Sequence, residues 1–417
     1  MKINTLISKQ TTLLLIITIS FATLFLPLTS LQAATLSDGM DASYVIGQAD
    51  FTAGETTTTQ NGLNDVAGVA VDSAGDRVFV SDGRGNRVLV YEYSGGITNG
   101  MNASYVLGHP DFVSKGPGGM EPPESPSQAN LSSPSSLEYD ADNDYLYVVD
   151  ANYARVLVYD VASITNGENA VYVIGQADFT SQAATVTQSG LSSPTGIALS
   201  NDGNTLYVAE GAVGRIVVYD VSTITNGENA INVLGAADFT TQDATTSQND
   251  FSDLGNIHLN GNTLYAADSQ SNRIMTFDVS TIVDGENAVN VLGQTDFTSY
   301  ATGTTAGTMN FPFDAYADSS NNRLFVAESG NSRVTIFDVT SITDGESAVN
   351  VLGQLDFTSN VATTSQSAFP HPASIGYDTT DDFLFVGSIV SLRIFDLSIA
   401  TAASSENGRG YIHPPLC

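Results

Sequence analysis

One eight-residue pattern recurs along this chain and limits the folds that the chain can adopt. It first stands at Tyr44–Phe51, as YVIGQADF. Five further copies follow at intervals of 58 to 67 residues: Tyr105–Phe112, Tyr172–Phe179, Asn232–Phe239, Asn290–Phe297 and Asn350–Phe357. A period of this length is typical of repeat architectures, in which each unit packs on its neighbours.

Each repeat unit reads as four short strands separated by turns. In the first unit we expect strands at Val66–Val71, Arg77–Val80 and Arg87–Tyr91, and a fourth strand from Tyr105. Successive positions are β-branched or aromatic, so both faces of each sheet require burial. Sheets packed face to face around an axis provide it. The sequence therefore predicts an all-β, six-bladed β-propeller of four-stranded antiparallel blades. A linear β-solenoid is the alternative, although its rungs are much shorter than this repeat.

The count of copies also predicts how the ring closes. One copy of the pattern precedes the first unit, and the sixth unit has none of its own. We therefore expect Tyr44–Phe51 to complete the last blade, around Phe383–Asp396, because a closed ring leaves no open sheet edge. The tail segment Asn407–Ile412 is a rival for this place. The expected boundaries are a propeller over residues 36–397 and a tail over 398–417.

Several units resemble NHL repeats. The segments that carry the resemblance are Pro194–Leu199, Leu206–Glu210, Arg215–Asp220, Tyr265–Arg273 and Phe325–Arg333. It covers about residues 62–396 and implies a propeller fold. It does not imply one activity, because NHL-type propellers include adaptors, extracellular binding modules and a few lyases and hydrolases. Each unit here carries extra residues in a Ser/Thr-rich link between its fourth strand and the next first strand.

The N-terminus has the features of a secretory signal peptide, expected over residues 1–33. Lys2 and Lys9 precede an apolar run, and small residues follow at Ala33 and Ala34; an uncleaved anchor helix is the alternative. We expect a secreted, periplasmic or cell-surface protein that leaves the membrane after cleavage. The chain has 45 Asp and Glu against 13 Lys and Arg, a net charge of −32. Such a surface disfavours nucleic acid, which requires basic patches.

Five units share an acidic residue at the end of the second strand and an arginine five residues later. These pairs are Asp82/Arg87, Asp150/Arg155, Glu210/Arg215, Asp268/Arg273 and Glu328/Arg333. A residue repeated in nearly every unit of a ring is usually structural, so we interpret each pair as a charge-assisted bond that holds a turn. A ring of charge at one mouth is the alternative. Unit six lacks the pair and has Gly387–Ser391 instead, which we interpret as a relaxed closing blade rather than a mouth opened for a ligand.

A binding site is expected where the repeats differ, on the first strands beside the axis. There the sequence places five candidate channel residues: Glu138, Asn256, His258, Asp314 and Tyr316. Carboxylates with an amide suit Ca²⁺, and Glu138 and Asp314 are the candidate metal ligands. An imidazole near a carboxylate could also serve as an acid or base. The alternative is that these side chains fill a narrow channel.

No nucleophile elbow, phosphate-binding loop or paired-cysteine metal motif occurs in the sequence. NHL-type lyases are understood to use several channel histidines, and here only His258 maps to an inner strand. The first hypothesis is therefore an exported, monomeric, non-enzymatic binding or scaffold module whose protein or glycan partner meets the Ser/Thr-rich face. The second is a Ca²⁺- or Zn²⁺-dependent hydrolase or lyase with its site in the channel.

Overall fold

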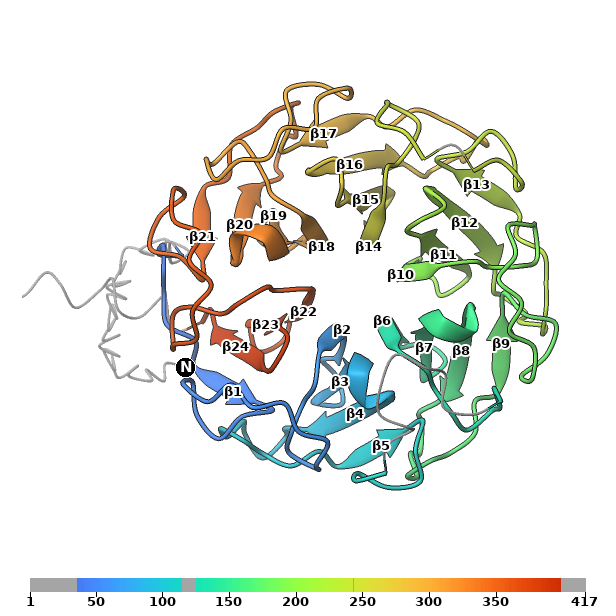
Figure 1. Cartoon of the computed structure of the whole chain (residues 1–417), viewed down its shortest axis with the longest axis horizontal. Coiled ribbons are helices and arrows are strands. Elements are labelled where there is room, and N and C mark those ends of the chain that lie inside the picture. The colour runs from blue at the N-terminus through green and yellow to red at the C-terminus, as the bar shows by residue number, and fades with distance from the viewer. Residues whose placement is uncertain (1–35, 115–124, 243, 399–417) are drawn as a thin grey trace, which may run out of the picture. The chain divides into compact units, whose positions relative to one another are not determined.

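The computed structural model describes residues 36–114, 125–242 and 244–398. Within these residues six four-stranded antiparallel sheets surround a central axis (Figure 1). This arrangement confirms the predicted six-bladed propeller. The predicted signal peptide and nearly all of the tail lie outside the described residues. No helix of the described part is long and apolar enough to cross a membrane.

The blades follow one another in chain order, and their strands run outward from the axis. Blade 1 contains β2 (Val66–Asp72), β3 (Arg77–Asp82), β4 (Arg87–Glu92) and β5 (Tyr105–Leu107); blade 2 contains β6 (Pro134–Asp140), β7 (Tyr145–Asp150), β8 (Arg155–Asp160) and β9 (Tyr172–Ile174); blade 3 contains β10 (Pro194–Leu199), β11 (Thr205–Glu210), β12 (Arg215–Asp220) and β13 (Asn232–Leu234). Blade 4 contains β14 (Leu254–Asn260), β15 (Thr263–Asp268), β16 (Arg273–Asp278) and β17 (Asn290–Leu292); blade 5 contains β18 (Pro312–Asp318), β19 (Arg323–Glu328), β20 (Arg333–Asp338) and β21 (Asn350–Leu352); blade 6 contains β22 (Ser374–Asp378), β23 (Phe383–Gly387), β24 (Leu392–Asp396) and β1 (Tyr44–Ile46). Short 3₁₀ turns follow the second strand in three blades: η1 (Gly83–Gly85), η2 (Ala151–Tyr153) and η3 (Ser329–Asn331).

The core lies between the blades, because alternate residues of a strand face opposite neighbours. On β12, Val217 packs in an apolar cluster shared with blade 2. The adjacent residues Ile216 and Val218 pack in a second cluster, shared with blade 4. This two-sided burial explains why the strands have apolar residues at consecutive positions.

The ring closes where the repeat count predicts. Strand β1 pairs antiparallel with β24, with Tyr44 opposite Ile394 and Ile46 opposite Leu392. The first strand in sequence is therefore the outer strand of the last blade, as Figure 1 shows. The rival segment 407–412 lies outside the described residues.

The outer edge of each blade is covered by a loop from the next unit. In blade 2, the Val173 N–H donates to Asn226 Oδ1 at 3.1 Å, and the Gly227 N–H donates to the Val173 carbonyl. We call this feature the Asx-Gly clasp. Its counterparts join Val45 to Asn99 and Gly100, Val106 to Asn166 and Gly167, Val233 to Asp284 and Gly285, Val291 to Asp344 and Gly345, and Val351 to Asp38 and Gly39.

The clasp needs glycine because Gly227 has a φ of +71° and lies against Ala177 of the blade that it covers. The clasp bonds to an N–H and a C=O group of the outer strand, which an exposed sheet edge would otherwise offer to another chain. The clasp from Asp38 and Gly39 belongs to the same N-terminal segment as β1, so this segment joins blades 5 and 6.

Replacing Asn226 with alanine is expected to lower the free energy of unfolding by about 1 kcal/mol, because the Val173 N–H loses its acceptor. Asn226→Asp is the matched control, since Asp284 fills the same position in the next clasp. Chemical denaturation of both variants measures the difference. Equal stability of the alanine variant and the wild type would contradict a stabilising role for the clasp.

Candidate functional site

The first strands place two rings of residues around the axis. The first ring consists of Gly68, Ser136, Gly196, Asn256, Asp314 and Ser374, and the second consists of Ala70, Glu138, Ala198, His258, Tyr316 and Gly376. The five candidate channel residues therefore all lie on axis-lining strands. Strand β6 carries Glu138, β14 carries Asn256 and His258, and β18 carries Asp314 and Tyr316.

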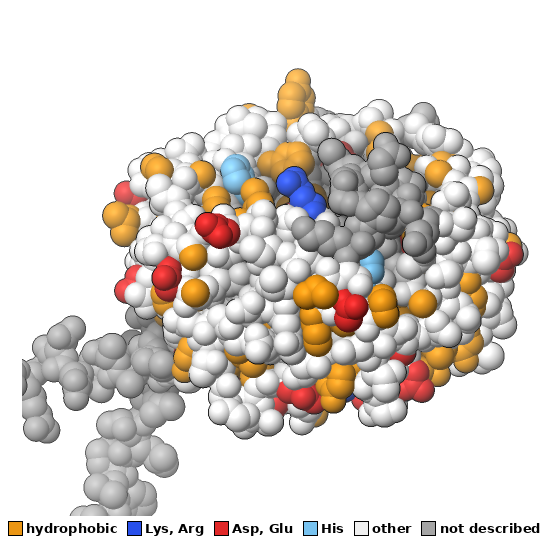
Figure 2. Space-filling model, turned by 60° about the horizontal axis from the view of Figure 1, so that its bottom comes forward, with side chains coloured by type: hydrophobic (Ala, Val, Ile, Leu, Met, Phe, Trp, Pro, Cys, Tyr) orange, Lys and Arg blue, Asp and Glu red, His pale blue; other side chains and the backbone are white. Residues whose placement is uncertain are grey.

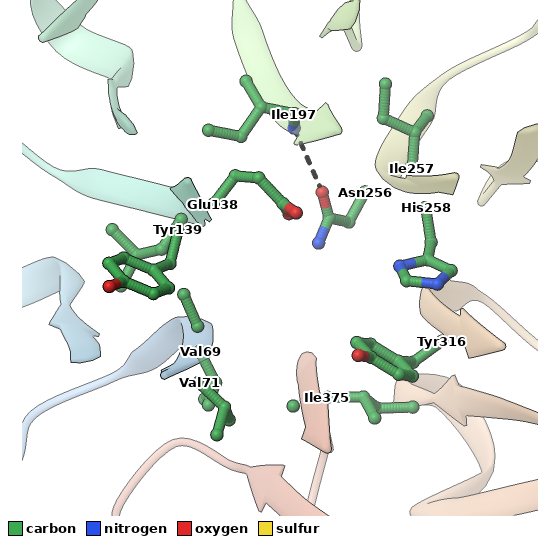
Figure 3. Close-up of a pocket in the computed structure, with 13 residues that line it drawn as sticks. Val69, Val71, Glu138, Tyr139, Ile197, Asn256, Ile257, His258, Tyr316 and Ile375 are labelled. Atoms are coloured by element: carbon green, nitrogen blue, oxygen red, sulfur yellow. Dashed lines mark hydrogen bonds between the residues drawn. The ribbon is translucent and has the colours of Figure 1, made fainter. Parts of the chain in front are cut away.

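The cavity at the centre of these rings is small. Its volume is about 60 Å³, and Glu138, Asn256, His258 and Tyr316 are among its lining residues, with apolar side chains between them (Figure 3). This space holds a few water molecules, whereas pockets for small organic ligands measure roughly 300–1,000 Å³. The inner strands of neighbouring blades approach closely. A Cβ atom added at Gly68 on β2 would lie 2.1 Å from the Ser135 carbonyl oxygen on β6.

Asp314 hydrogen-bonds to backbone groups of the channel wall and is not among the residues that line the cavity. It is 2% exposed, and its two carboxylate oxygens accept the N–H groups of Ile375 at 2.7 Å and Ala315 at 2.8 Å. The Asn256 amide also hydrogen-bonds to Asp314, while Asn256 Oδ1 accepts the Ser136 hydroxyl at 2.8 Å. Burial raises the pKa of Asp314 to about 7, against the opposing effect of these hydrogen bonds. The network links blades 2, 4, 5 and 6.

This arrangement does not fit the expected Ca²⁺ site. Both oxygens of Asp314 are already used by backbone donors, and calcium requires six to eight oxygen ligands. No three His, Cys, Asp or Glu side chains converge in a metal-binding group anywhere in the described residues.

Glu138 and His258 both face the cavity and have shifted pKa values. Burial raises the pKa of Glu138 to about 8, with smaller contributions from Asp314 and Asp140. Within the described residues, Glu138 has no hydrogen-bond partner. Burial lowers the pKa of His258 to about 4, and its ring lies 4.1 Å from that of Tyr316, centroid to centroid. At neutral pH the pair is therefore a largely protonated acid and a neutral imidazole.

The five acid–arginine pairs are buried and hold the links between the blades. In blade 1, Arg87 Nε lies 2.8 Å from Asp82 Oδ2, and both side chains are 0% exposed. The same guanidinium donates to the carbonyls of Phe112, Thr59 and Gly62. We call this unit the arginine staple. Its four counterparts are formed by Arg155 with Asp150, Arg215 with Glu210, Arg273 with Asp268, and Arg333 with Glu328, each fully buried.

The staple joins the second and third strands of a blade to two segments outside it, and the spacing of residues in the sequence does not predict these contacts. Its arginine reaches the Ser/Thr-rich link before its own blade and the phenylalanine of the repeated pattern after it. These side chains lie in the interior and not around an exposed mouth, and the acidic residue also accepts a backbone N–H, as Asp82 does from Asn64.

A repeated exposed feature was not among the sequence-based candidates. Four consecutive blades expose one apolar residue just before the outer strand: Val171 (41% exposed), Ile231 (53%), Val289 (55%) and Val349 (54%). We call these four residues the apolar rim stripe. Blades 1 and 6 have Ser104 and Ser43 at this position. The alignment of the repeats contains this signal, but only the structure shows that these positions are exposed.

Comparisons with known proteins agree on the fold. No curated protein matches the chain. A solved structure, a structural genomics protein of unknown function from Bacteroides thetaiotaomicron VPI-5482, superposes with a TM-score of 0.50 at 13% identity, over 85% of this chain and 75% of that chain. Residues 43–343 match the family described as "Lactonase, 7-bladed beta-propeller". The described residues of this chain form six blades rather than seven. Because the match spans most of its length, the chain belongs to this lactonase-type β-propeller family.

Proposed function

We propose that this protein is an exported, non-enzymatic binding module that holds a protein partner along the apolar rim stripe. The observation that carries the proposal is the repetition of one exposed apolar residue across four consecutive blades. Scattered exposed apolar residues are normal on protein surfaces, whereas here the same position is apolar and exposed in each of four consecutive blades. Because each side chain is already about half buried, covering one contributes only part of the roughly 1.5–3 kcal/mol of a fully exposed apolar side chain.

The size of the channel supports this function over catalysis. A cavity of about 60 Å³ leaves no room for an organic substrate at the axis. The resemblance to NHL repeats, which occur in adaptors and extracellular binding modules, also supports a binding role. Figure 2 shows one face of the molecule, on which hydrophobic and acidic side chains are scattered among uncharged ones and basic groups are few. A protein partner with a basic rim around an apolar centre suits such a surface.

The Ser/Thr-rich links are a second candidate surface, for a glycan partner. Part of their backbone is already used, because staple arginines bond to carbonyls such as those of Thr187 and Ser247. Exposed link residues such as Thr185 and Thr187 offer hydroxyl groups that can bond to sugar hydroxyls. The rim stripe is the stronger candidate, because removing apolar surface from water on binding contributes more free energy than covering hydroxyl groups that already bond to water.

The test is partner capture with matched surface variants. The stripe variant replaces Val171, Ile231, Val289 and Val349 with serine, the residue that blades 1 and 6 carry. The control replaces Val361, which is 60% exposed but lies off the stripe. We expect the stripe variant to lose, and the control to retain, a protein captured from the extracellular fraction of the source cells. Equal capture by both variants would overturn the proposal.

The second candidate function is hydrolysis in the channel. The family description and the pairing of a protonated Glu138 with a neutral His258 on one cavity favour it. It requires the channel to widen around a substrate. The hypothesis predicts lactone-hydrolysing activity that Glu138→Gln abolishes, measured as acid release from a panel of lactones. If the wild type hydrolyses none of these lactones, the hydrolase hypothesis is wrong and only the binding function remains.

A further inference from the structure

An arginine joins neighbouring blades at two places in the ring. In blade 1, Arg77 lies 2.7 Å from Asp72 of its own blade and 3.4 Å from Asp144 of blade 2. Its guanidinium carbon lies 5.5 Å from the centre of the Phe79 ring. We call this residue a bridging arginine. The second such arrangement joins blades 5 and 6 and consists of Arg323, Asp318 and Asp382.

The sequence of the next blade follows the presence of this arginine. A bridging arginine is the first residue of a second strand, and the aspartate that it reaches directly precedes the second strand of the next blade. Where the second strand begins with Tyr145, Thr205 or Thr263, the next blade has an asparagine instead: Asn204, Asn262 and Asn322. The exception is the junction of blades 6 and 1, where Phe383 begins the strand and Asp76 follows in the next blade.

A tyrosine takes over one of the two acids at this junction. Asp378 pairs with Phe383 in the first hairpin of blade 6, as Asp72 pairs with Arg77 in blade 1. Asp378 is 0% exposed, and its Oδ2 accepts the hydroxyl of Tyr93 from blade 1 at 2.7 Å. This tyrosine is specific to the junction, because the other blades have aliphatic residues in its place: Val161, Val221, Val279, Val339 and Leu397.

Two further acids at the junction have no cation. Asp76 is half-buried and Asp381 is exposed, and neither forms an ion pair within the described residues. Desolvation, and then repulsion by Asp378, Asp76 and Asp396, raises the pKa of Asp381. The acid at position 381 is specific to blade 6, since the other blades have Gly75, Asn143, Gly203, Gly261 and Asn321 there.

A pocket lies between these groups. It has a volume of about 360 Å³, which falls within the range of ligand pockets, roughly 300–1,000 Å³. Asp76 and Asp381 line it together with three aromatic residues, Tyr44, Tyr93 and Phe383. Aromatic rings attract cations through their faces. Because Asp381 is exposed, a ligand can reach the pocket from solvent.

We propose that the pocket between blades 6 and 1 binds the guanidinium group of a ligand, in the place that a bridging arginine fills in blades 1 and 5. A guanidinium is planar, pairs with carboxylates through several N–H groups and stacks on aromatic rings. A metal ion fits less well, because no metal-binding group of three His, Cys, Asp or Glu side chains occurs in the described residues. The net charge of −32 attracts cations to the surface. The site does not depend on the apolar rim stripe, which lies on blades 2 to 5.

The test is calorimetric titration of the full chain with N-acetylarginine amide, at pH 7 and low ionic strength. N-acetylcitrulline amide is the matched control ligand, because a neutral urea group replaces its guanidinium. We expect the wild type to bind the arginine compound and not the citrulline compound. Asp76→Asn and Asp381→Asn should each weaken binding by about fivefold, the effect of one partly exposed ion pair. The control Asp142→Asn removes an exposed charge from the corresponding turn of blade 2 and should leave binding unchanged.

A third variant supplies the missing group from the chain itself. Phe383→Arg gives blade 6 the residue that blades 1 and 5 carry, and it should abolish binding because its own guanidinium competes for Asp76. A capped glycine–arginine–glycine peptide identifies the source of the ligand. Binding of this peptide as tight as that of the amide supports an arginine of a polypeptide, and binding of the amide alone supports a small molecule.

The proposal is overturned if the wild type binds neither compound or binds both equally. It is also overturned if Phe383→Arg or the two aspartate variants bind as the wild type does, or if Asp142→Asn weakens binding as much as Asp76→Asn. Binding that appears only in Arg409→Gln would contradict an external ligand, because the tail of the chain would then fill the site.

Discussion

Replacing Arg87 with methionine is expected to lower the free energy of unfolding by about 3–5 kcal/mol. The change removes the hydrogen bonds to Asp82 and to the carbonyls of Phe112, Thr59 and Gly62, all in the interior. It also leaves the Asp82 carboxylate buried without a cation. Burial already raises the pKa of Asp82 to about 6 with Arg87 in place, so the variant should protonate this group on folding. Urea denaturation at pH 7 measures the loss.

The same hairpin supplies the control. Arg84 is 66% exposed and lies 3.3 Å from Asp65. Surface ion pairs of this kind contribute about 0–1 kcal/mol, so Arg84→Met should remain close to the wild type. If the two variants lose the same amount of stability, the staple does not hold the blades together.

The stability of the wild type is expected to fall, relative to Glu138→Gln, as the pH rises from about 5 to about 9. The folded-state pKa of Glu138 is raised from 4.5 to about 8, mainly by burial. A raised pKa means that the folded state binds the proton more tightly, so the stabilisation is complete below the unfolded-state value and is lost as the pH passes through the folded-state value. One pKa unit corresponds to about 1.4 kcal/mol. Because the cavity gives Glu138 some contact with solvent, we expect a relative change of about 2–4 kcal/mol.

Denaturation of both proteins at pH 5, 7 and 9 measures this change. Comparing the two at each pH cancels the opposing contribution of His258, whose lowered pKa costs stability as the pH falls from about 6.5 to about 4. Glu92→Gln is the control, because Glu92 is exposed at the end of β4. A difference between wild type and Glu138→Gln that does not vary with pH would mean that the carboxyl is well solvated.

The fold could be predicted because the repeat encodes it several times over. Six second strands and a displaced copy at Tyr44–Phe51 suffice to infer both the blade count and the partner of β24. Pairs such as Asp82 and Arg87 could also be recognised, since both residues belong to one hairpin. Local spacing determines such contacts.

Contacts between units could not be predicted in the same way. The residues Asn226 and Gly227 recur visibly, but nothing in their spacing indicates that they cover an edge in the preceding blade. The channel residues were placed on the correct strands, whereas the size of the channel depends on how closely the backbones approach at Gly68 and Gly196. The burial of Arg393, which is 1% exposed and donates to the Phe51 carbonyl at 3.2 Å, could not be predicted, because the same position is apolar in most other blades.

The position of the closing segment also determines when the fold can be completed. Ribosomes make residues 36–46 first, yet their partners in β21 and β24 are made last. Until then the growing chain has an unpaired outer strand at one end and unfinished blades at the other, and such intermediates tend to aggregate. A chain that ends before β24 therefore leaves β1 without its partner strand and cannot form the sixth sheet.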